Sequence, residues 1–250
     1  MKILLVNKYL YRKGGAETYF IKLGEYLKSL GNEVEYFGMA DERNCVENRV
    51  EAYTENIDFH KKSLKHITYP FKIIYSVNAR KQIRKVLSDF KPDVVHLNNF
   101  NYQLTPSIIY EIKKHNIPIV YTAHDVQLVC PNHKLKNDYT YGLCRKCDGG
   151  KYFECVKNNC VHSSKIRSIL GAVEAWYYKL RHTYKMIDLT VCPSEFMEKE
   201  ISRNDDINGR TVTMYNFIDE IKPLGAECEN YVLYFGRYSE EKGISNLVKA

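Results

Sequence analysis

The sequence lacks any run close to the ~18 consecutive apolar residues of a membrane-spanning helix, and its apolar start, MKILLVNKYL, is too short for a signal peptide. It also lacks a full G-x-G-x-x-G pattern, which argues against a dinucleotide-binding fingerprint. Hydrophobic residues make up 44% and charged residues 27%, which excludes disordered, collagen-like and low-complexity classes. We therefore expect a soluble, globular, cytoplasmic protein.

The length indicates how many domains the chain can form, and the net charge indicates what kind of partner it favours. A chain of 250 residues suits one large domain, or one domain and the start of another. Lys and Arg number 37 against 30 Asp and Glu, which gives a net charge of +7. This excess favours an anionic partner, such as a phosphorylated small molecule, a membrane surface or nucleic acid.

Buried strands and amphipathic helices alternate along most of the chain. Residues 2–7 form an apolar run, a loop with Gly14 and Gly15 follows, and residues 16–30 carry apolar residues at helical spacing before a second strand at 32–38. This is a βαβ unit. Further helices are predicted at 70–90, 105–115, 164–184 and 195–202, and further strands at 92–99, 117–125, 187–194 and 211–216. The pattern predicts an α/β fold with a Rossmann-like, doubly wound parallel sheet.

Ligands of such sheets bind at the carboxyl ends of the strands, which places the candidate site in the sequence. The residues predicted there are the Gly14 loop, His96, Asn98, His124, Asp125, Ser194 and Asn216.

A second domain is predicted to begin near the end of the sequence. Residues 1–216 form the first domain, with a cysteine-rich insertion at 130–162, and residues 217–230 are typical of a linker. Residues 231–237 predict a new strand, followed by a helical pattern. We therefore interpret residues 231–250 as the truncated start of another βα domain.

Six motifs together resemble those of a known enzyme family. They are GGAE (14–17), PDVVH (92–96), TAHD (122–125), CPSEF (192–196), NFID (216–219) and LYFGRYSEEKG (233–243). The chain resembles the amino-terminal part of a family 4 glycosyltransferase, a retaining enzyme of GT-B fold. The resemblance covers nearly the whole chain. It implies sugar transfer from a nucleoside-diphosphate sugar to a glycan or lipid-linked acceptor in polysaccharide or glycolipid synthesis, with no catalytic cofactor.

The resemblance also implies roles for individual residues. The first domain would bind mainly the acceptor, through His96, Asn98 and Ser194, and the second the donor. His124 and Asp125 match the segment whose histidine contacts the donor sugar. An imidazole there can bond a sugar hydroxyl or stabilise developing charge, although a structural histidine bonded to a backbone carbonyl is the alternative.

The resemblance also implies which residues bind the donor, around the diphosphate of the nucleotide-sugar. Gly14 and Gly15 permit positive φ and a close phosphate approach, or else form an ordinary turn. Arg237 and Lys242 match a diphosphate clamp, although such charges alone suit a solvated turn. Asn216 and Gly236 complete the donor set. The family's paired glutamates lie further along its second domain, so we expect this chain to be inactive alone.

Five of the eight cysteines fall in one polar, glycine-containing stretch with the pattern C-x13-C-x2-C-x7-C-x4-C. Such spacing suits a tetrahedral thiolate site with structural Zn²⁺. The predicted ligands are Cys144, Cys147, Cys155 and Cys160, with Cys130 and His133 as alternates. Reduced buried cysteines, a disulfide between Cys155 and Cys160, or an iron–sulfur cluster are the other interpretations.

Basic residues interleave with apolar ones in two predicted helical segments, 61–85 and 165–185. Such helices can bind anionic lipid headgroups, which predicts peripheral association with the inner face of the membrane; a solvated face over a core stripe is the alternative. Two other function classes remain: a zinc-ribbon nucleic-acid-binding module and a non-catalytic glycan- or lipid-binding domain. The spread of the basic residues along the chain disfavours nucleic acid.

Overall fold

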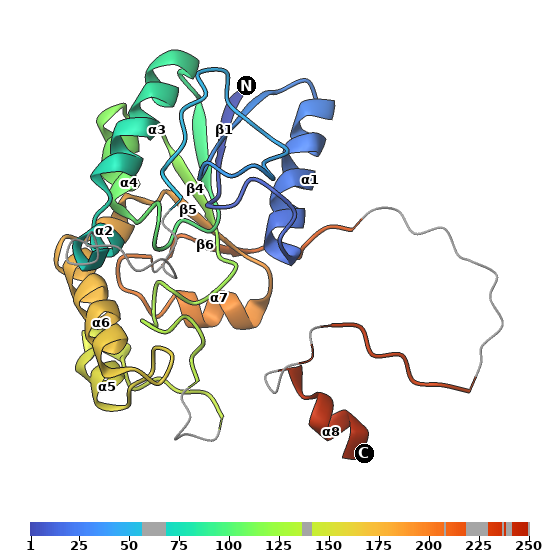
Figure 1. Cartoon of the computed structure of the whole chain (residues 1–250), viewed down its shortest axis with the longest axis vertical. Coiled ribbons are helices and arrows are strands. Elements are labelled where there is room, and N and C mark those ends of the chain that lie inside the picture. Colours follow the sequence, from blue (N-terminus) through green and yellow to red (C-terminus); the bar gives the residue numbers. More distant parts are fainter. Residues whose placement is uncertain are drawn as a thin grey trace. The chain divides into compact units, whose positions relative to one another are not determined.

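The computed structural model describes residues 1–56, 69–136, 142–207, 209–218, 230–236, 238 and 242–249. The chain divides into two compact units, Met1–Phe217 and Ile218–Ala250. The first unit contains the sheet and the helices around it (Figure 1). The described part of the second unit contains helix α8 (Ile244–Lys249).

Six parallel strands form a single sheet in the order β2-β1-β3-β4-β5-β6. This arrangement confirms the predicted Rossmann-like fold. The order reverses between β1 and β3, which makes the carboxyl ends of these two strands the switch point where ligands of such sheets bind. The strands are β1 (Lys2–Val6), β2 (Glu33–Phe37), β3 (Val94–Leu97), β4 (Ile119–Thr122), β5 (Leu189–Cys192) and β6 (Thr211–Thr213).

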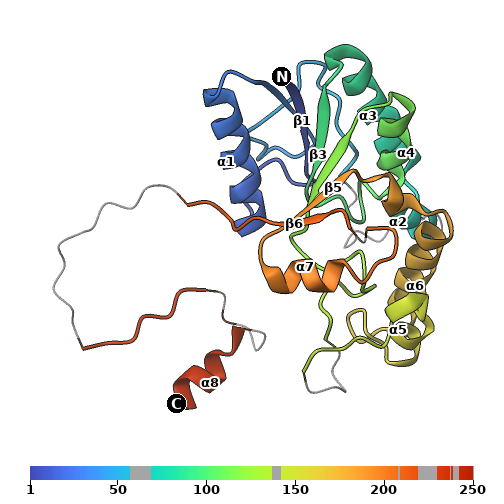
Figure 2. The same ribbon diagram turned by 180° about the vertical axis from the view of Figure 1, so that it is seen from behind.

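Helices cover both faces of the sheet, as Figures 1 and 2 show from opposite sides. Side chains of β1 alternate between the faces: Ile3 and Leu5 pack with α1, whereas Leu4 and Val6 join the larger core with α3 and α4. No helix in the described ranges is long and apolar enough to span a bilayer. The helices of this unit are α1 (Gly15–Ser29), α2 (Tyr69–Ile74), α3 (Val77–Phe90), α4 (Ser107–Lys114), α5 (Phe153–Lys157), α6 (Lys165–Leu180) and α7 (Glu195–Ile201).

The single helix predicted at 70–90 is wrong, because the chain breaks it into α2 and α3. Ser76 is extended, with φ −95° and ψ 98°, and its side chain accepts the Ala79 N–H at 3.1 Å as the cap of α3. Its own N–H donates to Thr105 Oγ1 at 3.1 Å. A tertiary hydrogen bond and a helix cap therefore fix the break, and neither changes the apolar periodicity of the segment.

The strand predicted at 231–237 is also absent from the described residues 230–236. Leu233 and Phe235 are exposed there, Phe235 to 98%. A strand needs a partner for its backbone N–H and C=O groups, and the apolar pattern does not provide one. Residue 237 lies outside the described residues.

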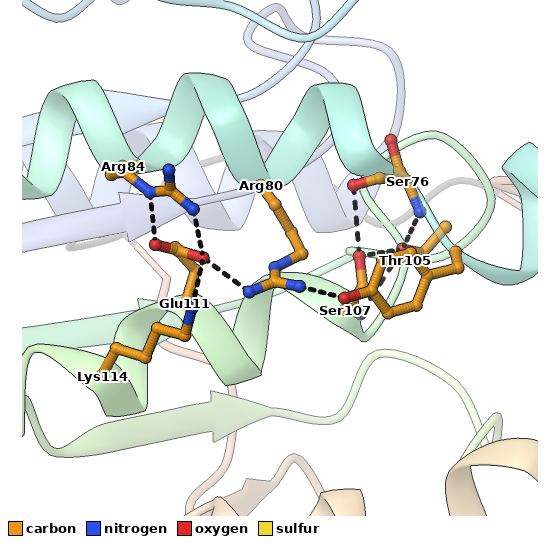
Figure 3. Close-up of polar contacts among 8 residues, drawn as sticks. Ser76, Arg80, Arg84, Thr105, Ser107, Glu111 and Lys114 are labelled. Atoms are coloured by element: carbon orange, nitrogen blue, oxygen red, sulfur yellow. Dashed lines mark hydrogen bonds and ion pairs between the residues drawn. The ribbon is translucent and has the colours of Figure 1, made fainter.

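Helices α3 and α4 are joined by an ion-pair cluster around Glu111 (Figure 3). Its carboxylate is 2% exposed and accepts from Arg80 Nη2 at 2.7 Å and from Arg84 Nε at 2.6 Å. The hydrogen bond from Arg84 chiefly lowers the pKa of Glu111, to about 2. Two arginines of the basic segment predicted to meet a membrane are therefore paired with Glu111, although the Arg84 side chain is still 54% exposed. Lys61, Lys62 and Lys65 of that segment lie outside the described residues.

Candidate active site

The loops that follow β1 and β3 are tied together at the switch point. Asn7, which is fully buried, accepts the Asn99 N–H at 2.9 Å and donates to the Tyr9 carbonyl at 2.7 Å. The Lys8 N–H donates to the Asn99 carbonyl at 2.7 Å. The two bonds to Asn99 join the loop after β1 to the loop after β3, and the bond to Tyr9 holds Asn7 within its own loop.

Gly14 and Gly15 lie at the amino end of α1, beside the switch point. Gly14 is extended, with φ −164°, and Gly15 begins the helix, so neither adopts the positive φ that glycine permits. The space around the pair still favours small residues at the first position, since a Cβ on Gly14 would meet Glu17 Oε2 at 3.3 Å. A Cβ on Gly15 would meet nothing within 4 Å, so there the backbone faces open space. A helix amino end of this kind attracts anions.

His124 follows β4 and is held by Asn98, which follows β3. The distance from His124 Nε2 to Asn98 Oδ1 is 2.9 Å, and since an amide oxygen only accepts, Nε2 donates. Burial lowers the pKa of His124 to about 4, so the ring is neutral at pH 7. The other amide atom, Asn98 Nδ2, is buried with no hydrogen-bond partner among the described residues. A neutral imidazole and an unused amide donor thus lie side by side.

His96, on the preceding strand β3, forms a second polar pair, with Thr122 of β4. Its Nε2 lies 2.7 Å from Thr122 Oγ1. Burial, with the nearby His124, lowers the pKa of His96 to about 4. His96 points across the sheet to β4, so it supports the strand-end residues from within.

A chain of polar side chains runs from Lys8 to Asp125. Lys8 Nζ donates to Asn101 Oδ1 at 2.6 Å, and Asn101 Nδ2 lies 3.3 Å from His133 Nδ1. His133 Nδ1 is 3.4 Å from Asp125 Oδ2, and its ring stacks on Tyr102 at 5.7 Å. Burial opposes ionisation of Asp125, but His133, the Gln127 N–H and Lys8 together lower the pKa of its carboxyl. Asp125 is therefore an anion, and His133, the Gln127 N–H and the Lys8 side chain stabilise its charge.

Glu174 of α6 faces the same cluster from the other side. It lines a cavity with His133, Gln127 and Tyr184. Burial raises the pKa of Glu174 to about 7, with His133 opposing the shift. A carboxyl group that changes charge near neutral pH therefore lies next to the Asp125–His133 pair.

The structure gives fewer contacts for the remaining predicted site residues. Ser194 caps α7 by accepting the Met197 N–H at 3.2 Å, so its hydroxyl has a structural role. Asn216 is exposed after β6. Gly236 and Lys242 are exposed in the second unit, and Arg237 lies outside the described residues. The donor clamp thus stays a prediction.

Sequence reasoning missed Lys8, Tyr19 and Glu174 as site residues. Tyr19, on α1, meets the His124 ring edge-on at 5.3 Å and also contacts Phe217 at 5.2 Å. Its helical spacing marked it as a core residue, and the structure places it at the strand ends instead. Lys8 could have been found from the sequence, because it directly follows a predicted buried strand.

The comparisons with known proteins define the class. The family model described as Glycosyltransferase Family 4 matches residues 13–151, more than half of the 250 residues. The chain belongs to this glycosyltransferase family, as its motifs predicted.

One curated sequence and two solved structures are among the proteins similar to the chain. An uncharacterised protein from the cps region of Klebsiella pneumoniae is 26% identical over 265 residues, and the chain spans 64% of its length. Sucrose-phosphate synthase from Thermosynechococcus elongatus has a TM-score of 0.50 at 14% identity, over 86% of this chain and 47% of its own. HepE of Anabaena, solved with UDP and glucose, has a TM-score of 0.47 at 15% identity, over 88% and 45%. The parallel sheet and the match to sucrose-phosphate synthase give the chain the fold of one half of a GT-B glycosyltransferase.

Proposed function

We propose that the protein transfers a sugar, with retention, from a nucleoside-diphosphate sugar to a glycan or lipid-linked acceptor in polysaccharide or glycolipid synthesis. The observation that carries the proposal is the pair of His124 and Asn98 at the strand ends of a family 4 chain. A neutral imidazole and a buried, unused amide N–H suit the hydroxyl groups of a sugar.

The electrostatics of the neighbouring groups support the same proposal. The open backbone at Gly15, at the amino end of α1, suits a phosphate of the donor. In this proposal Asn216 of the first domain and Gly236, Arg237 and Lys242 of the second supply further phosphate contacts. The Asp125–His133 pair, backed by Lys8, binds and orients the acceptor side, together with His96 and Asn98.

We also propose that α6 binds an anionic membrane surface at the cytoplasmic face. Apolar residues exposed on α6 recur every three or four positions, as on one helical face. Basic residues flank them at both ends of the helix. The apolar residues are Ile166, Ile169, Val173, Trp176 and Leu180, and the basic ones are Lys165, Arg167, Lys179 and Arg181.

A nucleic-acid-binding function has weaker support. Arg80 and Arg84, in the longest basic segment, both pair with the buried Glu111, so one of their two positive charges is neutralised. The chain's parallel sheet and family membership account for far more of the sequence than the paired cysteines do.

The proposal is tested with the native full-length protein and a panel of nucleotide-sugars. We expect release of a nucleoside diphosphate from one donor class, stimulated by a lipid-linked or glycan acceptor, with the anomeric configuration of the product equal to that of the donor. An inverted product would contradict retention. If calorimetry on the folded protein detected no binding of any nucleotide-sugar, the proposed function itself would be contradicted.

A further inference from the structure

Five cysteines that are spread over 31 residues of sequence converge on one small cavity. Its volume is about 10 Å³, and Cys130, Cys144, Cys147, Cys155 and Cys160 all line it. None of the five forms a disulfide in the described part of the chain. Five cysteines in the lining of one small cavity are more than packing alone explains, since a cysteine elsewhere in a core has apolar neighbours.

The segment that carries these cysteines has little structure of its own. Between Cys130 and Cys160 the described residues contain one 3-10 turn (Asp148–Gly150) and the five-residue helix α5. It attaches to its neighbours by polar contacts: Trp176 Nε1 donates to the Gly150 carbonyl at 3.0 Å, and Arg145 pairs with Glu200 of α7. Apolar contacts also hold the segment, because Cys130 and Leu135 belong to the main core and Tyr152 packs against Trp176. A bound metal ion would add to its folding energy.

We propose that Cys144, Cys147, Cys155 and Cys160 bind one Zn²⁺ ion as four thiolates. The four come as two close pairs, one before the 3-10 turn and one in and after α5. The second pair is brought together by the turn in which the Cys160 N–H donates to the Cys155 carbonyl at 3.1 Å. Two such pairs facing one cavity match the tetrahedral, all-sulfur sites that zinc prefers.

The two alternate ligands have other contacts. Cys130 Sγ donates to Asn132 Oδ1 at 2.9 Å on the wall of the cavity. His133 lines a different cavity and contacts Asp125. The separate cavity of His133 removes it from the set, and the pairing of the other four cysteines along the chain favours them over Cys130.

Binding requires the sulfur atoms to move inward. In the described part of the chain no three His, Cys, Asp or Glu side chains are yet close enough to a common point to hold an ion. Zinc–sulfur bonds of about 2.3 Å would draw the thiolates from the cavity walls to its centre. Gly149 and Gly150, both with positive φ, lie directly after the first pair and allow its turn to adjust.

The proposal is tested on the native full-length protein, purified without chelators and freed of any tag. Elemental analysis is expected to give about one zinc ion per chain. The Cys144→Ser and Cys155→Ser variants should lose most of it, whereas Cys45→Ser, at an exposed cysteine outside the segment, should keep it. Loss of zinc from Cys130→Ser would contradict the assigned ligand set.

A second measurement covers variants that fail to fold. Replacement of zinc by Co²⁺ in the wild-type chain should give the intense visible bands of a tetrahedral thiolate site. Absence of metal in wild-type protein reconstituted with zinc would overturn the proposal, as would a mass showing disulfides or a brown iron–sulfur chromophore. These readouts do not depend on sugar transfer, so the metal and the proposed function fail separately.

Discussion

The ring of Tyr19 on α1 meets the ring of His124 edge-on, with centroids 5.3 Å apart. This contact brings the helix that begins at the Gly14 loop against the end of strand β4. On the other side, Asn98 holds His124 Nε2 at 2.9 Å. The orientation of the histidine is therefore fixed from two directions before any ligand arrives, which is the preorganisation that transition-state stabilisation needs.

We predict that His124→Ala in the full-length protein lowers turnover of its nucleotide-sugar by about 100-fold or more, the loss expected for one preorganised hydrogen-bonding group. His115→Ala, at an exposed histidine, is the matched control and should leave turnover unchanged. Steady-state kinetics and a thermal melt of each variant separate the two effects. Turnover of His124→Ala near that of the wild type would remove His124 from the reaction.

Arg237→Ala and Lys242→Ala are expected to weaken turnover far more than stability. The loss of a charge-assisted bond to the leaving diphosphate should cost on the order of 2–4 kcal/mol in the transition state. Lys249→Ala, at an exposed lysine of α8, provides the control. If kcat/KM for both clamp variants matched that of Lys249→Ala, the clamp interpretation would be abandoned.

Glu111→Gln should lower the free energy of unfolding by about 2–3 kcal/mol, because it leaves Arg80 without its buried partner. The pKa of Glu111 is about 2 in the folded chain, below its ordinary value of 4.5. Its stabilisation is therefore complete above pH 4.5 and is lost as the pH falls toward 2. Chemical unfolding at several pH values measures both effects.

The control for this variant is Glu25→Gln, since Glu25 pairs with Arg12 on the surface at 3.6 Å. An exposed pair of this kind should contribute less than about 1 kcal/mol. Equal losses in the two variants would show that burial of Glu111 has no energetic role.

The membrane proposal predicts that the wild-type chain sediments with vesicles rich in anionic lipid and that binding falls as salt rises. Replacing Ile166 and Leu180 by serine should reduce binding several-fold, because both expose apolar surface on α6. Leu30→Ser, at an exposed leucine of the first unit, should not. Equal binding to neutral and anionic vesicles would contradict a role for the flanking basic residues.

Much of the fold could be predicted because parallel strands buried on both faces are continuous apolar runs. The run at 2–7 gave β1 almost to the residue, and the glycine after 16–30 marked the end of α1. The break at Ser76 could not be predicted, since it depends on Thr105, which is far away in the sequence. The same limit applies to the site. His124 and Asp125 stand at a strand end, whereas His133 reaches Asp125 through a loop without periodicity.

The central position of β1 has a consequence for how the chain is made. Ile3 is aligned with Val34 on one side and with Val94 on the other. At ~5–20 residues per second, synthesis brings out Val94 roughly 5–18 s after Ile3. During that interval one edge of an apolar strand has no partner, and parallel pairing over such a separation is intrinsically slow. The newly made amino-terminal segment is therefore exposed to wrong pairing along this edge until the residues of β3 have been made.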